Sequence, residues 1–522
     1  MPNSFGARLR TPQGLLASGL ILFGLLAFAL LVRARTLNNP VLGFDEQFYL
    51  LVGDRMLLGA VPYVDIFDRK PIGLFLIYAA IRGLGGEGFV EYKLVACGFV
   101  ALTAFLIYRA ARPLSSSFAA GVAACLYVLW LNFMGGEGGQ AAVFYNLPVL
   151  MAALLTWRAA RTLVRIVPLG CAAMLFVGIA IQIKYTAIFE GIFFGIALLW
   201  SYHLSRRNLA ALIAYALLWI GCALLPTALA ALAYWRIGAL QPFLFANFAS
   251  IFGRTPDPFS AQMIGLAKLC GILLPLLLLC ALSRRRRASE GTPAPGFPFL
   301  WLGAAILGVL LFGSFLSPQY GMPILVPACI AAAPFFASYR HARLVAAVML
   351  ATALIGSNIA LERSEFGKGG RAQALEIAQA AQPHHGCIYV YDGYPALYML
   401  THSCLPTRWV FPGHLNTSDE SSGNALGVDP AAEVRRILAM QPEVIIDDAP
   451  AYELGNPETR ALVETALARD YHLEKKVKTG TARYRLVYRL NGPSQVGNLA
   501  RKLGSEDAQT LAHGRDEAVD HR

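Results

Sequence analysis

Two adjacent carboxylates, Asp45 and Glu46, follow the first long apolar segment of the chain, and Lys70-Pro71 lies further along the same loop. A carboxylate can accept a proton from a hydroxyl group, and a lysine ammonium can bind a phosphate. Both types of side chain in one loop, at the mouth of a set of membrane segments, predict a reaction between a hydroxyl acceptor and a phosphate-bearing donor at the membrane surface.

Each of these residues also has a structural interpretation. Asp45 stands where an N-cap would lie for a helix over residues 46–58, and aspartate is a preferred N-cap. Arg69 and Lys70 precede an apolar stretch, 71–84, which is too short to span a bilayer and is predicted to lie at the interface. Basic residues in such a place can anchor the chain at lipid headgroups. The sequence leaves both interpretations open.

Four more candidates lie outside this loop. Glu137 stands in the flexible sequence GGEGGQ, as a second acid or as a polar turn residue. Lys184 lies between two apolar segments on a side that is otherwise poor in cations, which predicts a functional role. Gln319 and Tyr320 open an apolar segment whose prolines and glycine predict a kinked helix start. The kink would expose both side chains to a cavity, although it could also be structural alone.

The elements that must position these residues are membrane helices. Hydrophobic residues make up 56% of the chain and charged residues 15%, against about 25% charged in ordinary soluble domains. Apolar segments of about 18 residues recur, which predicts a polytopic α-helical membrane protein with about eleven transmembrane helices. The predicted spans are 14–32, 92–109, 117–134, 141–157, 167–183, 186–203, 209–233, 262–282, 297–315, 320–338 and 343–360.

The charge pattern gives the orientation. The formal net charge is +12, but the arginines cluster in short loops that all fall on one side of the predicted spans. This is the positive-inside pattern, so it predicts a cytoplasmic N-terminus and argues against a nucleic-acid partner. The loops 33–91 and 234–261, and the chain after about residue 361, are then predicted to face the opposite side.

The C-terminal part has a different pattern. Residues 361–490 alternate strand-like runs (CIYVYD, EVIIDD, HLEKKVKT, ARYRLVYRL) with helical patterns, which predicts a small extracytoplasmic α/β domain after a transmembrane domain over 1–360. Residues 491–522 are polar and aperiodic and are predicted to be disordered. Cys387 and Cys404 could form a disulfide on an oxidising side of the membrane, and the sequence leaves this open.

The order of these motifs resembles the GT-C superfamily of polytopic glycosyltransferases, with protein O-mannosyltransferases, aminoarabinose lipid A transferases and rhizobial core-sugar transferases as the most similar families. Asp45, Glu46 and Tyr49 match the D-E-x-x-Y motif of the first outer loop. Lys70-Pro71 matches the start of the K-P-P motif, and Lys184 matches a lysine after the fifth span.

Three positions depart from the family pattern. Ile72 replaces the second proline of K-P-P, and Lys93 replaces an arginine at the entry to the second span. Gln319-Tyr320, with Pro323 and Pro327, stands where the family has R-Y-x-x-P-x-x-P, so the arginine is lost. The departures at Lys93 and Gln319 bear on the subfamily and the substrate more than on the fold.

The resemblance implies an inverting glycosyltransferase that moves a sugar from a polyprenyl-phosphate donor to a hydroxyl of a lipid, glycan or protein acceptor. It implies a multi-pass protein of a bacterial inner membrane with the active site and C-terminal domain in the periplasm. No cofactor is required by the sequence, and a divalent metal remains open. The implied catalytic residues are Asp45, the general base, and Glu46. The implied substrate-binding residues are Tyr49, Arg69, Lys70, Glu137, Lys184, Gln319 and Tyr320.

Two other classes of function remain as alternatives. A lipid or oligosaccharide flippase or transporter would also be polytopic, but no inverted repeat is visible and the ionisable residues crowd one face instead of the membrane centre. A lipid-linked oligosaccharide ligase would share the bundle and the large outer region. Its first loop, however, would not need the acid-then-Lys-Pro order.

Overall fold

The structure is a computed structural model, and it describes residues 12–163, 165–206, 208–289 and 296–492. The N-terminal residues and nearly all of the tail predicted to be disordered, 491–522, lie outside this range. The chain divides into two compact units. The first contains the residues up to 252 together with 256–371, and the second contains 253–255 together with the residues from 372 onward.

The first unit consists of helices, because a backbone in lipid must satisfy its own hydrogen bonds. Its α-helices are α2 (Pro12–Leu37), α3 (Phe44–Leu57), α4 (Ile72–Arg82), α5 (Phe89–Ala111), α6 (Ser117–Phe133), α7 (Ala141–Thr162), α8 (Ile166–Ile181), α9 (Ala187–Arg206), α10 (Leu209–Arg236), α11 (Leu240–Leu244), α12 (Phe259–Ser289), α13 (Gly296–Phe312), α14 (Met322–Ser338) and α15 (Ala342–Lys368). Short 3₁₀ or π segments are η2 (Arg112–Leu114), η3 (Phe245–Ala249), η4 (Ser250–Gly253) and η5 (Pro318–Gly321).

Every predicted span corresponds to one of these helices. Among the described residues, 8 helices are long and apolar enough to cross a membrane. The other predicted spans are the shorter apolar helices α6, α8 and α13. The chain is therefore a polytopic membrane protein, as predicted.

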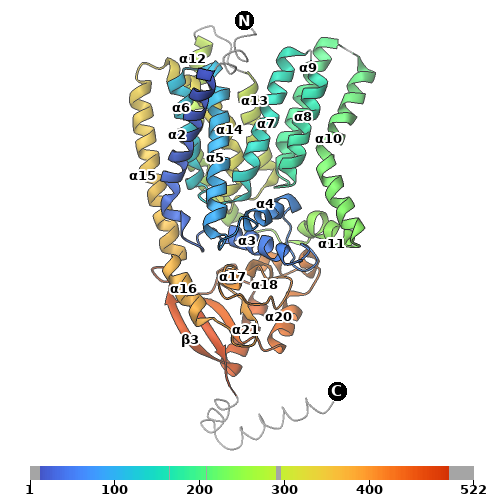
Figure 1. Cartoon of the computed structure of the whole chain (residues 1–522), viewed down its shortest axis with the longest axis vertical. Coiled ribbons are helices and arrows are strands. Elements are labelled where there is room, and N and C mark those ends of the chain that lie inside the picture. Colours follow the sequence, from blue (N-terminus) through green and yellow to red (C-terminus); the bar gives the residue numbers. More distant parts are fainter. Residues whose placement is uncertain (1–11, 164, 207, 290–295, 493–522) are drawn as a thin grey trace, which may run out of the picture. The chain divides into compact units, whose positions relative to one another are not determined.

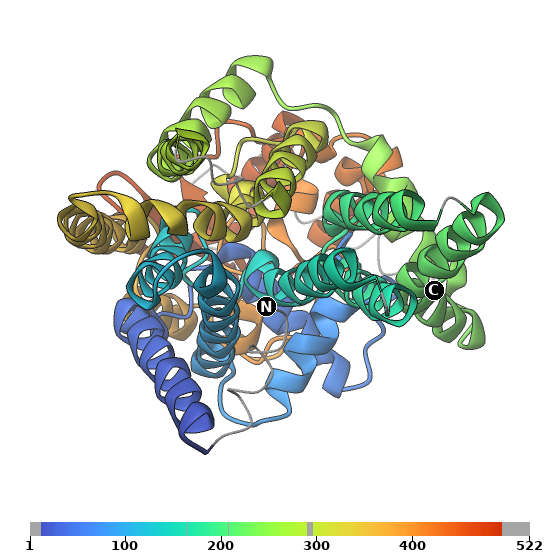
Figure 2. The ribbon, with the colours of Figure 1, turned by 90° about the horizontal axis from the view of Figure 1, so that it is seen from above.

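Helix α14 lies in the middle of the bundle, and its residues from Met322 to Phe336 are all buried. Helices α15 and α10 lie at opposite margins in both views (Figures 1 and 2). In α10 only Trp219 and Tyr234 are buried, so most of its apolar surface is free to face lipid. Helices α3, α4 and α11 gather at one end of the bundle (Figure 1).

Helices α3 and α4 form the layer that carries the first-loop motifs. A Cβ at Gly53 of α3 would lie 2.6 Å from the carbonyl carbon of Tyr78 in α4, so this glycine allows the two backbones to touch. The Arg82 guanidinium pairs with the Asp54 carboxylate at 3.0 Å and joins the same two helices. The helix predicted over 71–84 is present as α4, and its position at the membrane interface stays a prediction.

The second unit is a small α/β fold, as predicted for this part of the chain. Its sheet has the strand order β1-β2-β4-β3, with β1 and β2 parallel and the other neighbours antiparallel. The strands are β1 (Ile388–Val390), β2 (Val444–Ala449), β3 (Tyr471–Lys478) and β4 (Tyr484–Leu490). The helical elements are α16 (Arg371–Ala380), α17 (Leu397–Leu400), α18 (Pro412–Asn416), η6 (Ser418–Glu420), α19 (Gly423–Leu426), α20 (Pro430–Ala439) and α21 (Pro457–Asp470). Cys387 and Cys404 form a disulfide with a Cα–Cα distance of 5.0 Å.

Candidate active site

Asp45 lies in the first turn of α3, which begins at Phe44 with Gly43 as its N-cap residue. The interpretation of Asp45 as the N-cap is therefore wrong, because the helix starts one residue before it. Its Oδ2 instead accepts hydrogen bonds from Gln140 Nε2 at 3.0 Å and Gln319 Nε2 at 3.4 Å. Two amides from distant segments thus orient this carboxylate. Both of these hydrogen bonds end on Oδ2, so Oδ1 of Asp45 is left able to accept a hydrogen bond from a substrate hydroxyl.

Gln140 links the parts of this site, and the sequence did not single it out. It is the N-cap residue of α7, where its Oε1 accepts from the Ala141 backbone N–H at 2.9 Å. Its Nε2 donates to Asp45 and to Gln319 Oε1, and the hydroxyl of Tyr49 lies 3.5 Å from its Oε1. The sequence signal was a polar residue before the apolar run AAVF, which indicates a helix cap but does not reveal the second role.

A backbone contact between α4 and the turn after α8 brings Lys70 and Lys184 to the same region. The Leu74 N–H donates to the Gln182 carbonyl oxygen at 3.1 Å. A Cβ at Gly73 would lie 2.5 Å from that oxygen, so the glycine permits this approach. Lys70 lies two residues before α4, and Lys184 lies two residues beyond Gln182.

Both ammonium groups lie over aromatic rings of the predicted site. Lys70 Nζ is 5.7 Å from the ring centre of Tyr49 and 3.6 Å from Asp68 Oδ1. Lys184 Nζ is 4.4 Å from the ring centre of Tyr320. The structure therefore brings together the predicted residues Asp45, Tyr49, Lys70, Lys184, Gln319 and Tyr320.

The two lysines differ in protonation. Burial lowers the pKa of Lys70, but Asp68 and Asp45 outweigh this effect, so its pKa is raised and the side chain stays charged. Lys184 is 8% exposed. Burial, reinforced by the charge of Lys70 and opposed by Asp45, lowers its pKa to about 7. A lysine with a pKa near neutral pH, next to a second lysine that stays charged, has the electrostatics of an anion-binding site.

Glu46 and Glu137 form a separate buried group. The Glu46 carboxylate lies against the backbone of Gly43 and Gly138. Burial, with the charges of Asp45 and Glu137, raises the pKa of Glu46 to about 8. Glu46 is 3% exposed and Glu137 is 7% exposed. In these surroundings Glu46 is mainly protonated at neutral pH, which suits a structural role better than that of a second base.

Arg69 and Lys93 are each bound by other parts of the protein. Arg69 Nε donates to Ser250 Oγ at 2.7 Å. Lys93 Nζ donates to the carbonyl oxygens of Thr36 and Asn39, just where α2 ends. The lysine that replaces the family's arginine at position 93 therefore satisfies carbonyls at a helix C-terminus.

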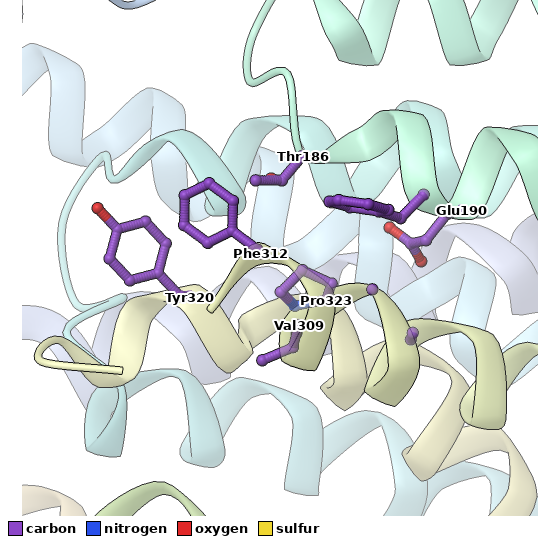
Figure 3. A pocket seen from close by; sticks show the side chains of 9 residues that line it. Thr186, Glu190, Val309, Phe312, Tyr320 and Pro323 are labelled. Atoms are coloured by element: carbon purple, nitrogen blue, oxygen red, sulfur yellow. The ribbon is translucent and has the colours of Figure 1, made fainter. Parts of the chain in front are cut away.

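Tyr320 also borders a cavity between α9, α13 and α14 (Figure 3). Its ring packs beside Phe312 at a centroid distance of 5.0 Å. The other lining side chains are mostly apolar, apart from Thr186 and the buried Glu190, which accepts a hydrogen bond from Trp301 Nε1 at 2.7 Å. Of the two residues expected to be exposed to a cavity, Tyr320 lines this one and Gln319 does not.

A metal site is not evident in the part of the chain that the structure describes. No three His, Cys, Asp or Glu side chains are grouped there so that they could hold an ion. The candidate site thus consists of one oriented carboxylate, two amides, two lysines and two tyrosines.

The chain is similar in structure to two crystal structures of ArnT from Cupriavidus metallidurans, one in the apo state and one bound to undecaprenyl phosphate. The TM-scores are 0.59 and 0.56 at 14% identity, and the alignments cover 90% of this chain and 98% of ArnT. The fold is that of ArnT. This confirms, for the fold, the resemblance to GT-C glycosyltransferases. No family model matches the chain, and no curated protein matches its sequence.

Proposed function

We propose that the protein is a membrane glycosyltransferase that moves a sugar from a polyprenyl-phosphate donor to a hydroxyl acceptor. One observation carries the proposal: residues far apart in sequence place an oriented carboxylate, Asp45, beside two lysines, Lys70 and Lys184, at one end of a membrane bundle. The fold shared with ArnT adds support, since ArnT binds undecaprenyl phosphate.

The proposed reaction is a single inverting displacement. Asp45 accepts the proton of the acceptor hydroxyl while the oxygen forms a bond to the anomeric carbon. The bond from that carbon to the phosphate oxygen breaks, and its electron pair leaves with the polyprenyl phosphate. Gln140 and Gln319 hold Oδ2 of Asp45 in place, so that Oδ1 can act as the base.

The lysines are proposed to stabilise the leaving group. The phosphate changes from a diester with one negative charge to a monoester with two, so charge develops where Lys70 and Lys184 lie. A preorganised electrostatic contact of this kind is typically worth about 3 kcal/mol in the transition state. General-base catalysis contributes a factor of about 10²–10⁴.

We further propose that the site faces the periplasm of a bacterial inner membrane and that the acceptor is a lipid, glycan or protein. The one-sided arginine pattern supports this orientation. The Cys387–Cys404 disulfide supports it as well, because disulfides persist on the oxidising side of a membrane. Neither a divalent metal nor a bound cofactor is part of the proposed mechanism.

The proposal is tested by sugar transfer in reconstituted membranes. Purified protein is supplied with a panel of labelled polyprenyl-phosphate sugars and a membrane extract as the acceptor source, and the release of polyprenyl phosphate is measured together with label transfer. We expect Lys70→Met to reduce transfer about 10²-fold. Lys478→Met, at an exposed position of β3, serves as the matched control. If Lys70→Met transfers sugar as fast as Lys478→Met, the assigned site is contradicted.

A further inference from the structure

The loop between α10 and α12 contains a helical segment, Leu240–Gly253, with its apolar side turned outward. Leu244, Phe248, Ile251 and Phe252 are 40%, 42%, 46% and 88% exposed. The segment consists of α11, η3 and η4, and all four side chains lie on its exposed side. We call these four residues the apolar face.

The opposite side of the segment is buried and combines the apolar residues Phe243 and Ala246 with the polar residues Asn247 and Ser250. Asn247 Oδ1 accepts a hydrogen bond from the Tyr185 hydroxyl at 2.6 Å. Ser250 Oγ accepts one from Arg69 Nε at 2.7 Å. Tyr185 follows Lys184, and Arg69 precedes Lys70. The segment thus keeps polar side chains bound inside the protein while it exposes large apolar ones, which is the pattern of a surface whose outside is not water.

The ends of the segment fix its height relative to the membrane. Only residues 237–239 separate it from α10, a membrane span. Trp235 and Ile237 at this junction are 62% and 59% exposed, and Phe259, which opens the next span, is 77% exposed. Exposed aromatic residues at the ends of spans are typical of the membrane–water interface. The apolar face therefore continues the lipid-facing surface of the spans.

We propose that Leu240–Gly253 is an interfacial helix whose apolar face inserts into the bilayer and holds the Lys70 and Lys184 segments at the level of the lipid headgroups. Such helices bury their apolar side by about 5–10 Å at the headgroup–acyl boundary. The hydrogen bonds of Asn247 and Ser250 then transmit this position to the neighbours of both lysines. Lipid contact does not depend on the proposed transferase activity.

The test places a photoreactive phenylalanine, p-benzoyl-phenylalanine, at position 252 of the full-length protein. The protein is reconstituted in vesicles of phosphatidylethanolamine and phosphatidylglycerol without any donor and irradiated, and the peptides are analysed by mass spectrometry. The same amino acid at position 452, where Tyr452 is 48% exposed in the second unit, serves as the control. A third variant, at position 248, repeats the test on the apolar face.

We expect phospholipid adducts at positions 252 and 248 and several-fold fewer at position 452. Adducts between two copies of the chain at position 252, in place of lipid adducts, would overturn the proposal and assign this face to self-association. Equal lipid labelling at all three positions, or none at 252 and 248 in folded protein, would also overturn it. Because no donor is present, failure here leaves the transferase proposal intact.

Discussion

The lowered pKa of Lys184 predicts a specific pH dependence for phosphate binding. In the unliganded site, burial, reinforced by the charge of Lys70 and opposed by Asp45, places this pKa at about 7. A bound phosphate favours the charged lysine and raises its pKa, so above neutral pH binding must take up a proton. Affinity is then full below about pH 7 and falls as the pH rises, by up to about tenfold per unit.

The magnitude follows from the same linkage. Between about pH 7 and pH 9, undecaprenyl phosphate remains a dianion because its second pKa lies near 6, so its own charge does not change. The dissociation constant of the wild type should therefore rise by up to about 100-fold over this range, provided that the pKa in the complex lies above 9. In Lys184→Arg the guanidinium stays charged, and the dissociation constant should be nearly constant.

The assay is a titration of the nanodisc-reconstituted protein with undecaprenyl phosphate at several pH values. Lys70→Arg is the matched control, because the pKa of Lys70 is already raised and this variant should retain the wild-type slope. Equal slopes for the wild type and Lys184→Arg would refute the reasoning. The lowered pKa would then have no part in phosphate binding.

Three further predictions concern single features. Gln140→Ala removes the hydrogen-bond donor to Asp45, so kcat should fall in a transfer assay. The same change removes the α7 cap, so thermal unfolding should show a loss of about 0.5–2 kcal/mol in stability. The pKa of Glu46 is raised from its ordinary value of 4.5 to about 8, so the free energy of unfolding falls as the pH rises from about 4.5 to about 8. Glu46→Gln should abolish this loss, about 5 kcal/mol, in unfolding scans at increasing pH. Joint replacement of Cys387 and Cys404 by serine should lower the free energy of unfolding by about 3 kcal/mol. In the wild-type protein, thiol trapping in cells should label neither cysteine, because both are in the disulfide.

The membrane fold was predictable because its signals are local. Each apolar run is long enough to indicate a helix by itself, and the strand-like runs CIYVYD and EVIIDD became the parallel strands β1 and β2. The start of α3 was predicted less well. An aspartate at this position favours a cap, but Gly43 is the N-cap residue and Asp45 lies within the first turn.

The candidate site was only partly predictable, because its surroundings come from distant segments. The family motifs indicated Asp45, Lys70 and Lys184, and the structure brings them together. The Glu46 carboxylate lies against Gly138 and its pKa is raised in part by the charge of Glu137, and both residues lie more than 90 positions away in the sequence. The second role of Gln140 likewise exists only once α3, α7 and η5 meet.

The most direct test of the account compares single-turnover sugar transfer by the wild type and Asp45→Asn at saturating donor. Asparagine keeps the size of the side chain but cannot accept the proton. The account predicts that the rate falls about 10²–10⁴-fold, while the affinity for undecaprenyl phosphate changes little because Lys70 and Lys184 remain. Transfer at the wild-type rate by Asp45→Asn would contradict the central claim that this carboxylate is the general base.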